Sequence, residues 1–129
     1  MSNHATAIAF LFLLAAVPLH AQVTVKDYRA ASTNDPANLL VQTYIKGLGE
    51  GIMLANLEAE RKKVSPYYAR QKLALTVDNY VNILEQTIKD LEANKYPAEQ
   101  LDTLPISIPL MHGLEVMFAC PANEKSQKN

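Results

Sequence analysis

The sequence has little of what most catalytic and metal sites require. One cysteine, Cys120, occurs among the 129 residues, so packing within the chain or against a partner has to stabilise the fold without an internal disulfide. Beyond residue 21 there is one histidine, His112. On a single helix these two residues would be separated by about 12 Å of rise, which is too far for a Cys–His pair. They also cannot supply the usual zinc ligand set.

Other signatures of chemistry are missing too. The carboxylate pairs Asp90 with Glu92 and Glu58 with Glu60 are two positions apart, so on helices their side chains point away from each other. No Gly-x-Ser-x-Gly elbow occurs, and a G-x-G-x-x-G phosphate loop would need glycine where Ile52 stands. We therefore predict no enzyme activity, no cofactor and no metal.

Charge is balanced overall and absent at the start of the chain. The 12 basic and 13 acidic residues leave a net charge of −1, which does not indicate a nucleic-acid partner. No charged side chain precedes Lys26, and residues 7–19 form an apolar run interrupted by Pro18. This run is shorter than the roughly 20 residues that span a membrane. It predicts a signal peptide over residues 1–21, cleaved near Ala21, and a periplasmic protein with no membrane attachment after cleavage. An uncleaved anchor is the alternative.

The segment from Leu104 to Pro121 is the most apolar part of the remaining chain, and we expect the fold to be organised around it. Its helical spacing predicts that one broad face is buried, made of Leu110, Met111, Leu114, Val116, Met117 and Phe118. Two starts are possible: Ser107 as N-cap with Pro109 in the first turn, or Pro105 as the first helical residue. Cys120 and Pro121 would end the helix.

Two amphipathic helices are predicted upstream. Asp35 before Pro36 favours a helix start, and apolar spacing continues to about residue 57. Gly47 and Gly51 share one face of this helix, which suggests that another backbone approaches there. Thr76 favours the start of the second helix, which would end near residue 94 and bury the apolar positions Val77, Tyr80, Val81, Leu84, Ile88 and Leu91.

The fold class that follows is all-α, a small bundle of three main helices with possible short extra helical turns. Residues 22–34 are predicted to be an N-terminal arm or loop, residues 35–121 the helical domain, and residues 122–129 a polar tail. The connection over residues 95–103 has room for one short helical turn.

Two irregular segments carry candidate partner-binding side chains. The first spans residues 58–72 and is rich in lysine and arginine with interleaved tyrosines; the second, over residues 95–103, is acidic. Rigid tyrosine and arginine anchors are typical of protein interfaces, so the candidates are Tyr67, Tyr68, Arg70, Tyr96, Glu99 and Asp102. The alternative is a solvated loop whose tyrosines fold back on the core. We expect His112 to be a partly buried structural residue or to face a partner, and Cys120 to be buried or to form an intermolecular bond.

Three short motifs carry a resemblance to a known family. They are Tyr44-Ile45-Lys46-Gly47 in the first long helix, Ser65-Pro66 in the basic loop, and Phe118-Ala119-Cys120-Pro121 at the end of the last helix. With these motifs, residues 40–121 resemble the Rap/Tai family of immunity proteins associated with type VI secretion. Members commonly have two cysteines that can pair, and Ser65 stands where a partner for Cys120 is expected.

The resemblance implies a homodimeric periplasmic immunity protein that binds and occludes a toxic effector. The family's targets include peptidoglycan amidases, and a protruding segment of the inhibitor would plug the cleft of the toxin. A different hypothesis is a small periplasmic carrier or chaperone, motivated by the Met- and Leu-rich last helix. A carboxylate-based enzyme site at Glu99 and Asp102 is a third.

Overall fold

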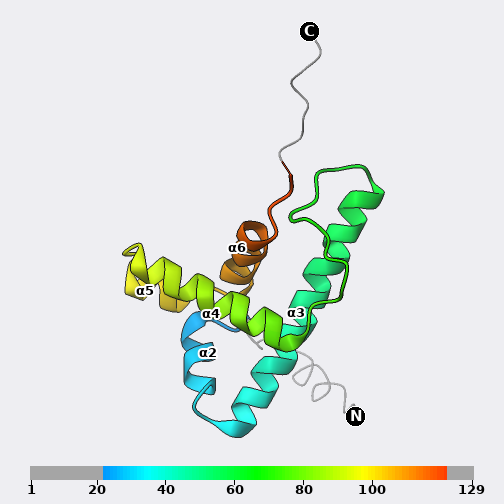
Figure 1. Ribbon diagram of the computed structural model, residues 1–129. Coiled ribbons are helices and arrows are strands. Elements are labelled where there is room, and N and C mark those ends of the chain that lie inside the picture. Colours follow the sequence, from blue (N-terminus) through cyan, green and yellow to red (C-terminus); the bar gives the residue numbers. More distant parts are fainter. Residues whose placement is uncertain (1–21, 122–129) are drawn as a thin grey trace, which may run out of the picture.

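The computed structural model describes residues 22–121, and this part of the chain is all-α (Figure 1). The predicted signal peptide and polar tail lie outside the described residues. The structure has three longer helices, α3 (Asp35–Arg61), α4 (Val77–Ala93) and α6 (Ser107–Met117). A short helix, α2 (Val25–Ala31), precedes α3, and another, α5 (Ala98–Thr103), lies between α4 and α6. The predicted fold class, three main helices with short additions, is confirmed.

The long helix α3 begins and ends differently from the prediction. Its N-cap is Asn34, whose side chain accepts a hydrogen bond from the Ala37 N–H, so Asp35 and Pro36 are already inside the first turn. The helix continues to Arg61 rather than to residue 57. Its buried positions follow helical spacing and include one polar residue: Ile45, Gly49, Ile52 and Asn56.

The central helix α4 agrees with its sequence pattern. Thr76 is the N-cap and forms a capping box with Asn79, which satisfies two backbone donors at the helix start. The buried face of α4 consists of Tyr80, Ile83, Leu84, Thr87 and Ile88. This face packs against both α3 and α6, so α4 is the element that connects the bundle (Figure 1).

The last helix is buried on a narrower face than predicted. It begins at Ser107 after Ile106 as N-cap, so neither predicted start, Ser107 as N-cap or Pro105 as first helical residue, was right, and it ends at Met117. Leu110 and Leu114 are fully buried, but the side chains of Val116 and Met117 are 66% and 54% exposed. The prediction that Val116 and Met117 belong to the core was wrong because the main neighbours of α6, α4 and α3, leave the far side of this apolar helix open.

Residues 22–34 are not a loose arm, and that prediction was wrong. Thr24 and Asp27 form a capping box that starts α2, and the backbone contact to Thr24 lowers the pKa of the Asp27 carboxyl. Val25 is fully buried, and Tyr28 is largely buried. A helix of seven residues offers too few turns for apolar periodicity to be recognised in the sequence.

Backbone hydrogen bonds attach this N-terminal segment to the junction between α5 and α6. The Val25 N–H donates to the Leu104 carbonyl, and the Ile106 N–H donates to the Val23 carbonyl. Leu101 on α5 is 1% exposed, so the predicted short turn is a helix that contributes to the core. The folded unit therefore includes the segment assigned to the arm.

The glycines that allow close packing are not the predicted pair. A Cβ added to Gly47 or Gly51 would meet nothing within 4 Å, so no other segment of residues 22–121 packs on this face, and the predicted approach within the bundle is wrong. A Cβ on Gly49 would lie 2.5 Å from the Tyr80 ring. A Cβ on Gly113 would lie 2.3 Å from Thr87 Oγ1. Gly49 and Gly113 thus permit the contacts of α3 and α6 with α4.

Candidate partner-binding surface

The segment from residue 62 to residue 76, here called the basic loop, folds back beside the second half of α3 (Figure 1). Asn56 on α3 holds it there and is 2% exposed. Its Nδ2 donates to the Tyr68 carbonyl at 2.9 Å, and its Oδ1 accepts from the N–H groups of Tyr67 at 2.7 Å and Tyr68 at 3.3 Å. One buried amide therefore satisfies three backbone groups of the loop.

The other side of the basic loop is attached to the chain that follows α6. The Ala69 N–H donates to the Phe118 carbonyl at 2.7 Å, and the Tyr68 and Phe118 rings lie 6.3 Å apart between centroids. Cys120 Sγ lies 3.7 Å from the Pro66 carbonyl oxygen. The loop is thus fixed at its middle from two directions, which limits its freedom to rearrange.

The structure separates the three candidates of the basic loop into two roles. Tyr67 is 52% exposed, and the Arg70 side chain is 65% exposed. Tyr68 is 3% exposed, so it belongs to the core and is not available as an anchor without unfolding the loop. Burial also raises the pKa of the Tyr68 phenol, with a smaller contribution from Glu60.

Two further apolar side chains extend this surface. Val64 is 60% exposed and Leu73 is 82% exposed, on the same loop as the exposed Tyr67. Large aliphatic side chains are usually buried, so this exposure is unusual. We call Val64, Tyr67, Arg70, Lys72 and Leu73 the loop surface. Sequence reasoning missed Leu73, although an isolated leucine between Lys72 and Ala74 outside any predicted helix was the available signal.

Acidic residues at the end of α3 neutralise part of the basic charge. Glu58 pairs with Arg61 at 2.6 Å and Lys62 at 3.3 Å, and the Arg61 guanidinium lowers the pKa of the Glu58 carboxyl. Glu60 lies 3.7 Å from Arg70. Within residues 22–121, Lys63 and Lys72 form no ion pair, so the loop keeps an excess of positive charge.

A hollow of about 210 Å³, the loop hollow, lies beside this surface between the end of α3, the basic loop and the start of α4. Its lining is mainly apolar and includes Met53, Leu57, Leu75 and the rings of Tyr68 and Tyr80, with Arg70 and Leu73 contributing as exposed residues. The loop surface therefore lies next to an apolar hollow, and the exposed guanidinium of Arg70 lies at the edge of both.

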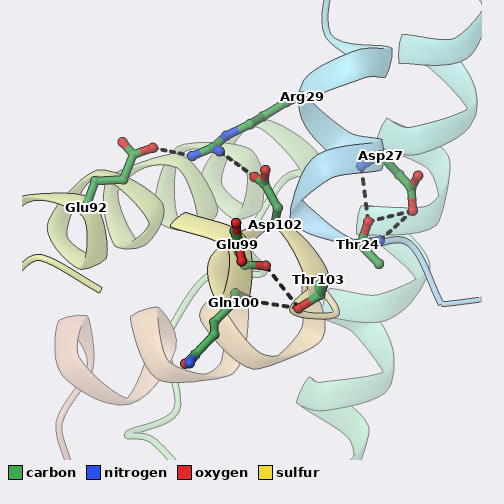
Figure 2. A network of polar contacts seen from close by, with 8 residues as sticks. All are labelled: Thr24, Asp27, Arg29, Glu92, Glu99, Gln100, Asp102 and Thr103. Atoms are coloured by element: carbon green, nitrogen blue, oxygen red, sulfur yellow. Dashed lines mark hydrogen bonds and ion pairs between the residues drawn. The ribbon is translucent and has the colours of Figure 1, made fainter. Parts of the chain in front are cut away.

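The acidic candidates occupy a different part of the molecule, around α5, and they serve the fold (Figures 1 and 2). Arg29 on α2 donates to Asp102 Oδ1 on α5 at 2.8 Å and also pairs with Glu92 at the end of α4. Tyr96 is half-buried against the core, whereas Glu99 is exposed. Asp102 is thus engaged in joining α2 to α5, and the two groups of candidates do not form one site.

His112 and Cys120 are both exposed, so the prediction that they are buried was wrong. The alternatives, that His112 faces a partner and that Cys120 forms an intermolecular bond, stay predictions. His112 lines a second hollow of about 180 Å³ between α4 and α6. Within residues 22–121, no group of three or more His, Cys, Asp or Glu side chains is placed to hold a metal ion. None of the helices in that same range is both long and apolar enough to cross a membrane.

Comparisons with known proteins give no relative: no family model, no curated protein and no solved structure matches this chain.

Proposed function

We propose that this protein is a periplasmic immunity protein that binds and occludes a toxic secreted effector, with a peptidoglycan amidase as the target class. The carrying observation is the loop surface, on which a tyrosine, an arginine and two aliphatic side chains are exposed on a loop that Asn56 immobilises. Interfaces concentrate their binding energy in tyrosine and arginine side chains of this kind, and rigidity reduces the entropy lost on binding. The periplasmic location rests on the apolar run in residues 1–21.

A second observation supports the resemblance to the Rap/Tai family. Ser65 stands where a partner for Cys120 was expected, and the structure brings Cys120 Sγ to 3.7 Å from the carbonyl of Pro66, the next residue. The two chain segments that a family disulfide would join are therefore neighbours in this fold as well.

The homodimer that the resemblance implies would use the open face of α3. Leu40 and Leu54 are 72% and 61% exposed on this helix, and they lie at the same heptad position as Gly47. Nothing within 4 Å would meet a Cβ at Gly47 or Gly51, so a second helix can approach closely between the leucines. Sedimentation of the Leu40→Glu, Leu54→Glu double variant should then show monomers, whereas a Lys89→Glu control should remain dimeric.

A carrier of apolar molecules is the second candidate, and hollow size argues against it. The two hollows described above measure about 210 and 180 Å³, and a larger one of about 290 Å³ between α2 and α4 is lined mainly by polar and charged residues. Pockets that enclose drug-sized ligands usually measure about 300–1,000 Å³. Native mass spectrometry of protein purified from the periplasm distinguishes the two functions, because a carrier retains a co-purified apolar molecule and an inhibitor does not.

The decisive experiment mixes the purified protein with the secreted product of the neighbouring reading frame. We expect a stable complex by size-exclusion chromatography and loss of cell-wall cleavage by that product. Replacing Tyr67 and Arg70 with alanine should weaken the complex, because aromatic and arginine anchors contribute about 2 kcal/mol or more each when they are central to an interface. Alanine at Tyr96 and Glu99 is the matched control. Failure of every neighbouring product to bind would contradict the proposal.

A further inference from the structure

The rings of two buried tyrosines, Tyr68 and Tyr80, line the loop hollow. Tyr68 and Tyr80 are 3% and 2% exposed, yet neither hydroxyl makes a hydrogen bond to another residue within 22–121. Neither oxygen is completely shielded, since this region has no fully buried polar side-chain atom without a partner. Buried tyrosines usually find a partner for their hydroxyl. Here the hydroxyls remain available to a group that enters from outside.

The contrast with Tyr28 shows that this is a local property. The Tyr28 hydroxyl donates to Glu85 Oε1 at 2.8 Å, so a tyrosine of similar burial elsewhere in the bundle is satisfied. Asn56 and Thr87, the buried polar residues, are also bonded. Unpartnered hydroxyls thus coincide with the loop hollow.

The size of the loop hollow indicates what can enter it. An apolar cavity of about 150 Å³ holds a benzene molecule, so about 210 Å³ accommodates one aromatic or long aliphatic side chain. Met53, Leu57 and Leu75 supply apolar walls. A backbone carbonyl next to the inserted side chain would be the natural acceptor for a phenol hydroxyl. The hollow is too small for a folded element.

The charge beside the hollow indicates what should flank that side chain. Arg70 lines the hollow and is loosely held, with its guanidinium 3.7 Å from Glu60 and its side chain 65% exposed. Lys72 is exposed on the same segment and forms no ion pair within residues 22–121. A carboxylate on the incoming chain would be attracted to Lys72 and would replace Glu60 as the partner of Arg70.

We propose that the loop hollow is the specificity pocket of this protein and receives one large apolar side chain, flanked by acidic residues, from the partner protein. The inference rests on the proposed function and identifies the chemistry of the partner at that surface. Leu73, which is 82% exposed at the rim, closes over the inserted side chain and becomes buried in the complex.

Short peptides test the pocket without requiring the natural partner. The probes are acetyl-Asp-Phe-Asp-amide, the same peptide with lysines in place of the aspartates, and the same peptide with alanine in place of phenylalanine. Titration into isotope-labelled protein, followed by amide NMR shifts, should perturb Tyr68, Ala74, Leu75 and Tyr80 saturably. Replacing phenylalanine with alanine should weaken binding by about ten-fold or more, because burial of the ring is lost. The lysine peptide should bind about five-fold more weakly.

Two matched variants locate the site. Ala74 lines the hollow and is exposed, so Ala74→Trp should fill the hollow and abolish the shifts, whereas Ala98→Trp on the exposed start of α5 should not. Equal binding of the phenylalanine and alanine peptides would overturn the inference. So would shifts confined to the second hollow, unchanged binding by Ala74→Trp, or equally tight binding of free indole, which would indicate a small-molecule site.

The same variants distinguish this inference from the proposed function. If Ala74→Trp still binds and inhibits the effector, the pocket assignment fails while the immunity function stands. If the acidic peptide occupies the hollow but no neighbouring gene product binds, the pocket stands and the immunity function fails.

Discussion

Asn56 and Arg29 attach different parts of the chain to the long helices, and they do so by opposite means. Asn56 is 2% exposed, carries no charge and makes three hydrogen bonds to the backbone of the basic loop. Arg29 has a side chain that is 39% exposed and connects α2 to carboxylates on α4 and α5 (Figure 2). Both side chains contact more than one partner.

The comparison shows that burial, and not the number of contacts, determines what such a tie contributes. Exposed ion pairs contribute about 0–1 kcal/mol because water screens them and long side chains lose entropy. Removing the partner of a buried backbone group costs about 1–3 kcal/mol for each group left unsatisfied. The loop surface, which we propose to bind the partner, is therefore supported by the stronger of the two ties.

The largest effect is expected from Asn56→Ala. It leaves the Tyr67 and Tyr68 N–H groups and the Tyr68 carbonyl without their partner, so unfolding free energy should fall by about 3 kcal/mol. Urea unfolding followed by circular dichroism measures this. Asn38→Ala is the matched control near the start of α3, where the Asn38 side chain accepts a hydrogen bond from Gln42. Equal losses from the two variants would contradict the assigned importance of burial.

The next largest effect is expected from a disulfide bond engineered at the same loop. Ser65→Cys should form a disulfide with Cys120, because Cys120 Sγ already lies near Pro66. Loop closure of this kind stabilises by about 2–3 kcal/mol. Loss of both free thiols on oxidation, together with an unfolding midpoint that reductant lowers, would show the bridge. Ser32→Cys on the exposed C-cap of α2 is the control and should leave its thiol free of Cys120. Two titratable thiols after oxidation of the Ser65 variant would contradict the prediction.

The helices could be predicted from the sequence where periodicity was long enough. The apolar spacing of α4 and its Thr76 cap predicted that helix well, since 17 residues repeat the pattern over several turns. Spacing cannot show how many neighbours cover an apolar face, which is why Val116 and Met117 were wrongly assigned to the interior.

The candidate site was predictable only in part. Tyr67 and Arg70 were found from composition and are exposed, but Tyr68 differs from Tyr67 only in the path of the loop. That path depends on hydrogen bonds between the Asn56 side chain and backbone groups 11 and 12 residues away. Backbone donors carry no sequence signature. A polar residue at the fourth buried position of α3 was the one visible sign.

The close contact of Gly113 with α4 should affect stability by an amount between those expected for Asn56 and Arg29. Gly113→Ala would place a Cβ 2.3 Å from Thr87 Oγ1 and 2.6 Å from Ile83 Cγ2, so α4 and α6 must move apart at a cost of about 2 kcal/mol. In the Leu40→Glu, Leu54→Glu background, where the proposed dimer is broken, Gly47→Ala meets nothing within 4 Å and should raise stability by about 0.5–1 kcal/mol. Thermal unfolding of the two variants should therefore shift in opposite directions. Shifts of the same sign would contradict the packing described for α6.

The hydrogen bond between Tyr28 and Glu85 is part-buried, so its contribution to stability should fall between those of the Asn56 and Arg29 contacts. The Tyr28 hydroxyl donates to Glu85. Burial raises the pKa of the phenol, and this hydrogen bond raises it further. Tyr28→Phe should lower unfolding free energy by about 1 kcal/mol at neutral pH. Urea unfolding at neutral pH measures this loss. A loss no larger than that from Tyr67→Phe, an exposed control, would contradict the assigned contribution of this hydrogen bond.

The pKa of Tyr28 also predicts a dependence on pH. Burial raises the pKa values of the Tyr68 and Tyr80 phenols as well, so the unfolded chain loses these protons before the folded one. The stabilisation is complete below the ordinary phenol pKa of about 10 and is lost as pH rises above it. Tyr28→Phe should make this alkaline loss less steep, as measured by urea unfolding in parallel with tyrosinate absorbance. An unchanged slope would contradict the prediction.

The smallest effect should come from Arg29→Ala. The side chains of Arg29, Glu92 and Asp102 are each more than a third exposed, so unfolding free energy should fall by only about 0.5 kcal/mol at low salt. In 1 M salt the screening length falls to about 3 Å, and the difference from the native chain should vanish. The loss from Asn56→Ala should persist at both salt concentrations because neutral buried hydrogen bonds are not screened. A salt-independent loss of about 2 kcal/mol or more for Arg29→Ala would show that the charged tie behaves like the buried one, and the order of the two would have to be reversed.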